Sequence, residues 1–363
     1  MRRPLPGALS AALVALFVLI SLSASGCAGS APAGPRAPWE GPLTPQAQAV
    51  EKAVDRAYRH TAKVTVAVAY LDLTSGAQVL RNENRPFHAA STMKVPVMIA
   101  AWDAVDQGAM TIDQPVAVRN EFRSIVDGSR YHLAPADDAD PQLYAAVGTT
   151  LPLSELIRHM IVRSSNLATN LLVDQLGAAR VVDAMRRLGA YSTQVLRGVE
   201  DEKAYQAGLN NEVTALDLMV MLAAIARTAG NPAAAPAAPP DPGANEALAA
   251  PLLSHRAATA MLAVLAAQEF NEKIPAGLPA GVPVAHKTGD IVGFHHDAAI
   301  VSPPGEQPYV LVVLTGGFAD EAAADRFIAG LSRGIWEARH LPPPPPPGAT
   351  PRRHRPGGDS GRE

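Results

Sequence analysis

Apolar and polar residues alternate near both ends of the chain, and this period of two predicts β-strands there. The strands are predicted at residues 64–70, 77–80, 282–288, 298–301 and 309–315. Apolar positions at helical spacing predict one helix from Thr44 to about His60 and another over residues 321–339. We therefore expect an α/β fold of the α+β type, in which both ends of the chain build one antiparallel, five-stranded sheet flanked by helices.

Between these ends, from about residue 108 to 280, the apolar residues recur at helical spacing. Helices are predicted at residues 153–162, 167–176, 178–188, 211–226 and 257–267. We expect them to form an all-helical lobe inserted between the strands. A loop over residues 120–148 carries the acidic cluster Asp137, Asp138 and Asp140, which we interpret as solvated, with a cation site as the alternative. An Ala/Pro-rich stretch at 231–251 predicts a surface insertion.

The N-terminal residues predict a targeting signal rather than part of the fold. Arg2 and Arg3 precede an apolar stretch over residues 8–22, and small residues then lead to Cys27, the one cysteine of the chain. This arrangement resembles a bacterial lipoprotein signal over residues 1–27, in which the cysteine carries the lipid; an ordinary cleaved signal is the alternative. We therefore expect an exported protein of the cell envelope or periplasm, held to a membrane through Cys27.

Flexible segments are predicted on both sides of the folded part. Residues 28–43 are rich in Ala, Gly and Pro and would form a tether, and the proline-rich residues 341–363 predict a disordered tail. The remaining residues 44–340 are enough to bury a sizeable core. The formal net charge of −3, the 5% aromatic content and the lack of a Lys/Arg stripe argue against a nucleic-acid partner. We expect a monomer.

Ser91 and Lys94 stand at the start of a strongly apolar run, residues 95–102, which predicts a buried helix. Two residues three positions apart on a helix lie on one face, close enough for their side chains to touch. A serine hydroxyl becomes nucleophilic when a neighbouring base takes its proton, and burial or nearby cations lower the pKa of a lysine enough for that role. The free N–H groups of a helix start would stabilise an oxyanion there. Alone, this S-x-x-K pattern occurs by chance in many proteins, and a capped, solvated helix start is the favoured interpretation of it.

Two further short motifs occur in matching contexts. Ser164-Ser165-Asn166 links two predicted helices, and His286-Lys287-Thr288-Gly289 lies on a predicted strand. S-x-x-K, S-x-N and K-T-G in this order belong to the signature of penicillin-recognising enzymes. Over residues 44–340 the chain therefore resembles the serine β-lactamase and penicillin-binding family, and more closely its class A β-lactamase branch. The resemblance implies the β-lactamase/transpeptidase-like fold.

The residue types and the resemblance together imply a role for each motif residue. Ser91 would attack the acyl carbon, Lys94 would accept or relay its proton, and Ser164 would pass a proton to the leaving nitrogen. The backbone N–H groups of Ser91 and Asp290 would form the oxyanion hole. The expected substrate-binding residues are Asn166, Lys287, Thr288, Gly289 and Asp290.

The same resemblance implies a base for the hydrolytic water, because class A enzymes place a glutamate in a loop after S-x-N. Glu200 is our candidate, with Asp201 and Glu202 as alternatives. Two positions depart from the class A pattern. Ala204 stands where an asparagine helps to hold the water, and Asp290 puts a carboxylate beside the expected site of the substrate carboxylate. These departures are compatible with acylation and predict slower β-lactam turnover.

The expected function is a serine hydrolase that opens β-lactam amides through an acyl-Ser91 intermediate, with water activated by Glu200 and without a cofactor. One alternative is a penicillin-binding D,D-peptidase, or another acyl hydrolase, with slow lactam turnover on a peptidoglycan-like substrate. Another is a non-catalytic, cell-wall-binding lipoprotein. His286, His295 and His296 lack the cysteine or acidic ligand spacing of a metal site, so we expect hydrogen bonds between strands there and no metal.

Overall fold

The computed structural model describes residues 44–59, 61, 63–230 and 253–341. The expected lipoprotein signal with Cys27, the tether, the Ala/Pro-rich insertion and the proline-rich tail after residue 341 lie outside the described residues. Within the described part, each helix is too short or too polar to cross a membrane.

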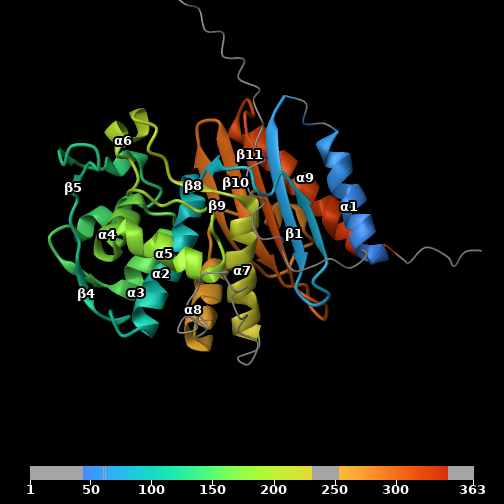
Figure 1. The fold of residues 1–363 in the computed structure, drawn as a ribbon, viewed down its shortest axis with the longest axis horizontal. Helices are drawn as coiled ribbons and strands as arrows, with labels where there is room; N and C mark the ends of the chain where they lie inside the picture. The colour runs from blue at the N-terminus through green and yellow to red at the C-terminus, as the bar shows by residue number, and fades with distance from the viewer. Residues whose placement is uncertain (1–43, 60, 62, 231–252, 342–363) are drawn as a thin grey trace, which may run out of the picture. The chain divides into compact units, whose positions relative to one another are not determined.

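Five strands form one antiparallel sheet from both ends of the chain, as predicted. They are β1 (Thr65–Asp72), β2 (Gln78–Arg81), β9 (Val284–Ile291), β10 (Phe294–Val301) and β11 (Tyr309–Gly316). Their order across the sheet is β2-β1-β11-β10-β9, so an early strand pairs with the last one (Figure 1). β10 begins at Phe294 rather than at the predicted residue 298, because the buried polar residues His295, His296 and Asp297 hide its apolar alternation.

Alternate residues of each strand point to opposite sides, so the sheet has two apolar faces, and both are covered by helices. Four long helices do this: α1 (Pro45–Tyr58), α7 (Ala215–Gly230), α8 (His255–Ala266) and α9 (Glu321–Arg339). Val66 and Val68 of β1 belong to the apolar cluster that includes α1 and α9. Ala67 and Ala69 belong to the cluster that includes α7, α8 and the helical lobe.

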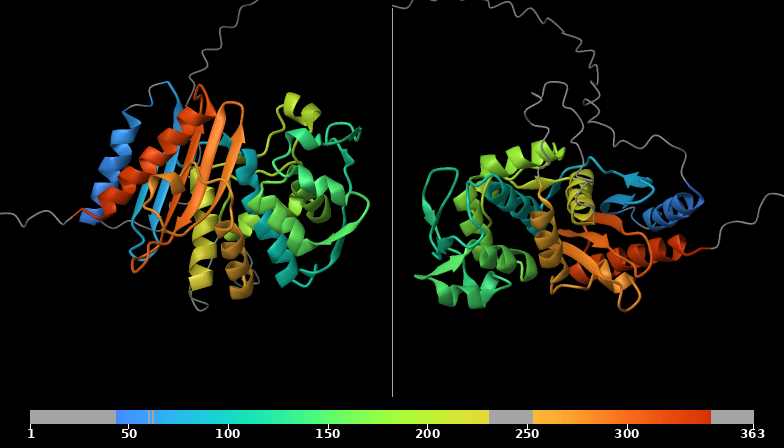
Figure 2. Two further views of the ribbon diagram at one scale, coloured as in Figure 1. Left: turned by 180° about the vertical axis from the view of Figure 1, so that it is seen from behind. Right: turned by 90° about the horizontal axis from the view of Figure 1, so that it is seen from below.

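The middle of the chain forms the predicted lobe, on the opposite side of α7 and α8 from α1 and α9 (Figure 2). Its helices α3 (Leu153–Val162) and α5 (Ala178–Leu188) have the predicted bounds, and α4 (Asn166–Leu176) begins one residue early. α7 begins at Ala215 rather than at residue 211, because the preceding strand β8 (Glu212–Val213) pairs with β3 (Phe87–His88).

The lobe also contains short strand pairs that the helical pattern did not predict. They are β4 (Pro115–Ala117) with β7 (Thr150–Pro152) and β5 (Phe122–Arg123) with β6 (Arg130–Tyr131). Strands of two or three residues are too short to show an alternation of apolar and polar positions. The lobe is therefore mainly helical rather than all-helical.

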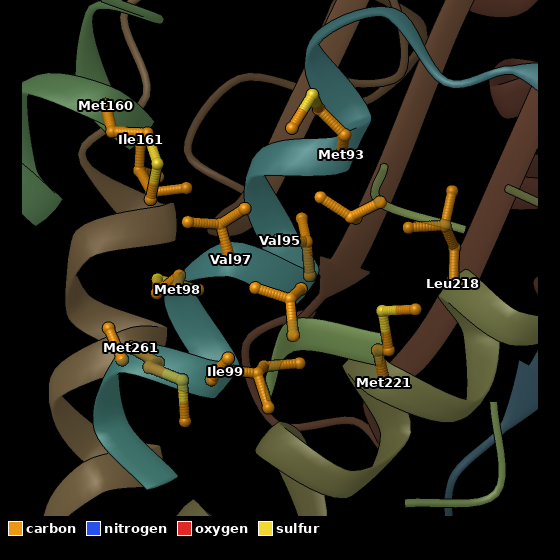
Figure 3. Packing of buried hydrophobic residues seen from close by; sticks show 14 of the residues in the cluster. Met93, Val95, Val97, Met98, Ile99, Met160, Ile161, Leu218, Met221 and Met261 are labelled. Atoms are coloured by element: carbon orange, nitrogen blue, oxygen red, sulfur yellow. The ribbon is translucent and has the colours of Figure 1, made fainter. Parts of the chain in front are cut away.

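Helix α2 (Lys94–Asp106) lies in the middle of the core, and all of its residues from Lys94 to Ala104 are buried. A helix that is apolar all round has no face for solvent. Side chains from α3, α7 and α8 surround it, among them Ile161, Leu218 and Met261 (Figure 3). A 3₁₀ turn, η1 (Ala90–Met93), leads directly into α2. The core thus fixes the segment that carries Ser91 and Lys94.

Candidate active site

Ser91 lies in η1, where the backbone is held on both sides of it. Ala90, the residue before it, has a φ of +45°, a left-handed conformation that is unfavourable for a residue other than glycine. On the other side, β9 approaches so closely that a Cβ on Gly289 would lie 2.9 Å from Thr92 N and 3.1 Å from Ser91 N. Glycine alone permits this approach. The K-T-G strand therefore meets the backbone of the candidate nucleophile.

The side chain of Lys94 is fully buried where α2 begins. Its Nζ donates to Ser164 O at 2.5 Å and to Asn166 Oδ1 at 2.9 Å, and it lies 3.1 Å from Ser164 Oγ. The S-x-x-K and S-x-N motifs, predicted to act together, thus meet at one amine.

The two lysines of the motifs share an environment that disfavours their charged forms. Burial lowers the pKa of Lys94 well below its usual value, and the nearby charge of Lys287 lowers it further. Burial also lowers the pKa of Lys287, to about 7. Lys287 Nζ donates to Thr288 O at 3.0 Å. Because an amine with a low pKa accepts protons near neutral pH, Lys94 has the property that a general base requires.

Ser164 occupies the tight link between α3 and α4 with a φ of +58°. Behind it, Asp138 accepts the backbone N–H groups of Asn166 at 3.1 Å and of Leu167 at 2.9 Å. A carboxylate there satisfies free donors of the first helical turn and interacts favourably with the helix dipole. The prediction of a solvated acidic loop is therefore wrong for Asp138 and Asp140, which are 6% and 1% exposed. Sequence reasoning missed them because their partners lie far along the chain.

Glu200 reaches the same centre from the loop before α6 (Glu202–Gln206). Its Oε1 accepts the side-chain amide of Asn166 at 2.6 Å, so Asn166 joins Glu200 to Lys94. Partial burial raises the pKa of Glu200 above its usual value, although the bond from Asn166 opposes the shift. A carboxylate with a raised pKa is a stronger base toward water.

The loop that carries Glu200 is fastened to α4 by Asn170. The buried Asn170 accepts Val199 N through Oδ1 at 2.6 Å and donates to Val199 O through Nδ2 at 3.0 Å. Gly198 makes room for these bonds, since a Cβ there would lie 2.4 Å from Asn170 Oδ1. The residue directly before Glu200 is therefore held by both of its backbone groups.

The two alternative bases are bonded elsewhere. Asp201 is 2% exposed and accepts the backbone N–H groups of Ile125 at 2.9 Å and of Ala204 at 3.2 Å. Glu202 accepts the side-chain amide of Gln206 at 2.9 Å on the short helix α6. Of the three carboxylates, Glu200 is the one joined to the Lys94 network.

Backbone strain gathers at the same centre. Among the described residues other than glycine, a positive φ occurs at Asn82, Ala90, Ser164 and Glu200. One of these precedes Ser91 directly, and two are candidate catalytic residues themselves. Left-handed conformations of this kind persist only where the surrounding structure holds them, and they cluster at functional sites. The strain therefore supports the same assignment as the hydrogen bonds.

Asp290, which follows the K-T-G motif, is not an isolated anion. Lys273 Nζ lies 3.1 Å from its carboxylate, and His295 Nδ1 lies 2.9 Å from it. Burial alone would lower the pKa of Lys273, but the neighbouring Asp290 and Asp325 raise it above its usual value. This amine therefore stays charged. The expected repulsion of a substrate carboxylate is thus offset. Sequence reasoning missed Lys273, because a single lysine between a helix and a strand belongs to no motif.

Thr288 lies one position along β9 from both Lys287 and Gly289. Side chains alternate along a strand, so Thr288 shares a face with Asp290 and lies opposite to Lys287. Its side chain is nearly buried, at 4% exposure for the residue. Its binding to a substrate carboxylate stays a prediction.

The three histidines near the K-T-G motif take part in hydrogen bonds between segments, as predicted. His286 Nδ1 lies 2.9 Å from Asp297 Oδ1 across β9 and β10, and His296 Nε2 donates to His88 O at 2.9 Å. Within the described residues, the group with metal-like spacing is instead Asp290, Glu321 and Asp325. The Lys273 ammonium lies among these carboxylates and already supplies a positive charge.

Comparison with known proteins supports the expected family and fold. The family model described as "Beta-lactamase enzyme family" matches residues 48–238 and 245–338. A β-lactamase from Streptomyces fradiae is 29% identical over 195 residues, which cover 53% of this chain and 57% of that protein. An ancestral (GNCA) class A β-lactamase is similar in structure, with a TM-score of 0.62, 25% identity and coverage of 80% of this chain and 99% of that one.

A second similar structure is a variant of PBP-A in an acyl-enzyme complex with penicillin G. It has a TM-score of 0.60 and 26% identity, and the match covers 83% of this chain and 98% of that one. The fold and the meeting of the three motifs thus define a protein of the serine β-lactamase and penicillin-binding class. The family match spans most of the described residues, and the chain belongs to the β-lactamase enzyme family. The match to the Streptomyces fradiae protein spans little more than half of that relative's length.

Proposed function

We propose that this protein opens the amide bond of β-lactams through an ester formed on Ser91. The observation that carries the proposal is the chain of hydrogen bonds that runs from Lys94 through Asn166 to Glu200. It joins a buried amine of low pKa, suited to activate a serine, to a carboxylate of raised pKa, suited to activate water. A β-lactamase needs both.

In the acylation step, the Ser91 hydroxyl attacks the lactam carbonyl carbon while neutral Lys94 takes its proton. The tetrahedral oxyanion is stabilised by the backbone N–H groups of Ser91 and Asp290. The C–N bond then breaks, and the nitrogen receives a proton from the Ser164 hydroxyl. Lys94 returns its proton to Ser164, whose Oγ lies 3.1 Å from Nζ. The amine is again neutral, and Ser91 carries the acyl group.

In the deacylation step, Glu200 takes a proton from a water molecule that attacks the ester carbon. The bond to Ser91 Oγ breaks, and that oxygen receives the proton that Glu200 took from the water, so Glu200 is again ionised and Ser91 again carries a hydroxyl. Ionised Glu200 is required, so this step needs a pH above the raised pKa of its carboxyl. A positioned base contributes about 10²- to 10⁴-fold to such a step.

The substrate carboxylate would be bound by positive charge at the edge of the sheet. Lys287 would supply it when protonated, and Thr288 would supply a hydroxyl donor. Lys273 neutralises Asp290, which otherwise repels the same group.

Slow turnover, as in a penicillin-binding D,D-peptidase, is a second candidate that one observation favours. Ala204 is fully buried and has no side-chain amide to hold the attacking water four residues after Glu200. A loosely held water slows deacylation and lengthens the life of the acyl-enzyme. A non-catalytic wall-binding protein is less consistent with the site, because such a protein has no need for a buried, low-pKa lysine in contact with Ser164.

We also propose that the protein is exported and anchored through a lipid on Cys27. Labelling of the cells with a radioactive fatty acid tests this location. Label is expected on the full chain and not on its Cys27→Ala variant. Equal label on both chains would contradict the anchor.

A labelling experiment tests the function. Wild-type protein, Ser91→Ala and Glu200→Gln are mixed with a fluorescent penicillin, and the bound label and its release are followed. Release from the wild type and a persistent label on Glu200→Gln are expected, with no label on Ser91→Ala. A long-lived label on the wild type supports the peptidase instead. Label of equal intensity on Ser91→Ala would contradict the ester.

A further inference from the structure

The residue before Ser91 is held by a side chain outside the three motifs. Ala90 N donates to His88 Nδ1 at 3.1 Å, and this hydrogen bond spans the single residue between them, Ala89. Ala90 is the residue with the φ of +45°, so this bond supports a backbone conformation that alanine disfavours. Because Nδ1 accepts, it carries no proton, and the proton of neutral His88 is on Nε2.

His88 is itself fixed in place. Its carbonyl accepts His296 Nε2 at 2.9 Å, and His296 Nδ1 accepts Thr315 N at 3.1 Å, which ties β3 to the central sheet. Its ring lies 6.0 Å from the ring of Phe294 and 6.1 Å from that of Tyr205. The imidazole therefore has little freedom to turn away from Ala90.

We propose that His88 is a positioning residue, which as a neutral imidazole holds Ala90 in its left-handed conformation and so presents Ser91 to the acyl group. The inference rests on the proposed acyl-transfer function. It adds a residue outside S-x-x-K, S-x-N and K-T-G to the machinery of the same step. His88 does not touch the reacting atoms in this account.

The surroundings of His88 favour its neutral form. Burial lowers the pKa of His88, and the charge of Arg197 lowers it further. Three other ionisable residues lie near His88. They are Tyr205 on α6, Glu212 on β8, which pairs with His88 across the strands, and His296, whose pKa is lowered to about 4 by burial. Nε2 of His88 is buried and, within the described residues, makes no hydrogen bond. At neutral pH, Nδ1 is therefore free to accept the Ala90 N–H.

Protonation would remove the bond. An imidazolium carries N–H groups on both nitrogens, so Nδ1 would then point a donor at the donor of Ala90. We expect this loss only below the usual pKa of histidine, because the local pKa is lowered.

Two variants separate the acceptor from the ring. His88→Asn keeps an acceptor at the same distance along the side chain, since asparagine readily accepts the backbone N–H two residues on. His88→Phe keeps an aromatic ring against Phe294 and Tyr205 and removes the acceptor. The rate of labelling by fluorescent penicillin is measured under single-turnover conditions, so that acylation alone is observed.

We expect His88→Phe to acylate about tenfold more slowly than the wild type, and His88→Asn to retain most of the rate. We further expect the ratio of the wild-type rate to the His88→Asn rate to fall as the pH is lowered from about 7 to about 4.5, because only the wild type loses its acceptor. Equal rates in His88→Phe and the wild type would overturn the proposal. So would equal losses in both variants, or a ratio that does not change with pH.

Exchange of the Ala90 amide hydrogen distinguishes failure of this proposal from failure of the proposed function. Slow exchange is expected in the wild type and His88→Asn, and faster exchange in His88→Phe. If the wild-type protein binds no penicillin but shows this exchange pattern, the proposed acyl transfer is contradicted. The proposal that His88 holds Ala90 in place is then still confirmed. An Ala90 amide that exchanges equally in all three chains would overturn the role of His88.

Discussion

Asn166 donates its side-chain amide to Glu200 at 2.6 Å. The oxygen of the same amide accepts Lys94 at 2.9 Å. One side chain therefore contacts both the candidate base for acylation and the candidate base for deacylation. Since an amide has distinct donor and acceptor ends, a substitution that changes only one end affects the two steps differently.

Asn166→Asp is such a substitution. The new carboxylate can still accept from Lys94, but it faces Glu200 with a second negative charge, which raises the pKa of the Glu200 carboxyl further. We expect deacylation to slow by more than acylation. We also expect the fall in the deacylation rate at low pH to begin at a higher pH than in the wild type. Single-turnover labelling gives the first rate and release of the label gives the second. Equal slowing of both steps would contradict the division of roles at Asn166.

Glu200→Gln removes the base for water and leaves acylation in place. We expect release of the acyl group to fall by about 10²- to 10⁴-fold. In the wild type, release should decline as the pH falls through the pKa of Glu200, because only the ionised carboxylate accepts a proton. Burial raises that pKa above the usual value, so the decline should begin at a higher pH than for an ordinary glutamate. A release rate that is independent of pH across this range would exclude Glu200 as the base.

Gly289→Ala tests the contact between the K-T-G strand and the nucleophile turn. The added Cβ would lie 2.9 Å from Thr92 N, closer than real Cβ atoms come, so η1 or β9 must shift. We expect acylation to slow by about 10²-fold, because small displacements at a reacting centre are costly. Gly330→Ala on α9 is the matched control. Its Cβ meets nothing within 4 Å, and it should keep full activity with stability unchanged or slightly raised.

Lys273→Met leaves the carboxylate of Asp290 without its buried ammonium partner. We expect KM to rise by about tenfold for β-lactams that carry a carboxylate and much less for their neutral esters. Unfolding should also become easier by about 2 kcal/mol, because the amine lies between Asp290 and Asp325. The double variant Lys273→Met with Asp290→Asn should recover much of the KM, since it removes both charges. Failure of this recovery would show that Lys273 acts in another way.

The sheet and most of the helices could be predicted because the spacing of apolar residues within each segment is enough to identify it. α3 and α5 show a helical period, and α5 ends at a glycine in the left-handed conformation. β10 was predicted too short, since His295, His296 and Asp297 are polar and become buried only through bonds to other segments. The spacing of hydrophobic residues along the chain gives no information on hydrogen bonds to distant segments.

The site could be predicted as far as its motifs extend. Ser91, Lys94 and Asn166 belong to short patterns with known chemistry, and the structure joins Lys94 to Asn166. Asp138 and Lys273 could not be predicted, because each acts through partners distant in sequence and belongs to no motif. A buried carboxylate that caps a helix has the same local sequence as a solvated one, so burial alone distinguishes them.

Mass spectrometry of the intact protein after mixing with penicillin G tests the covalent account most directly. Glu200→Gln should gain the mass of one whole penicillin, because ring opening adds the molecule without loss of atoms, and peptide mapping should place it on Ser91. The wild type should gain it transiently, and Ser91→Ala should gain none. A mass gain on another residue, or turnover of penicillin by Ser91→Ala at the wild-type rate, would contradict the ester on Ser91.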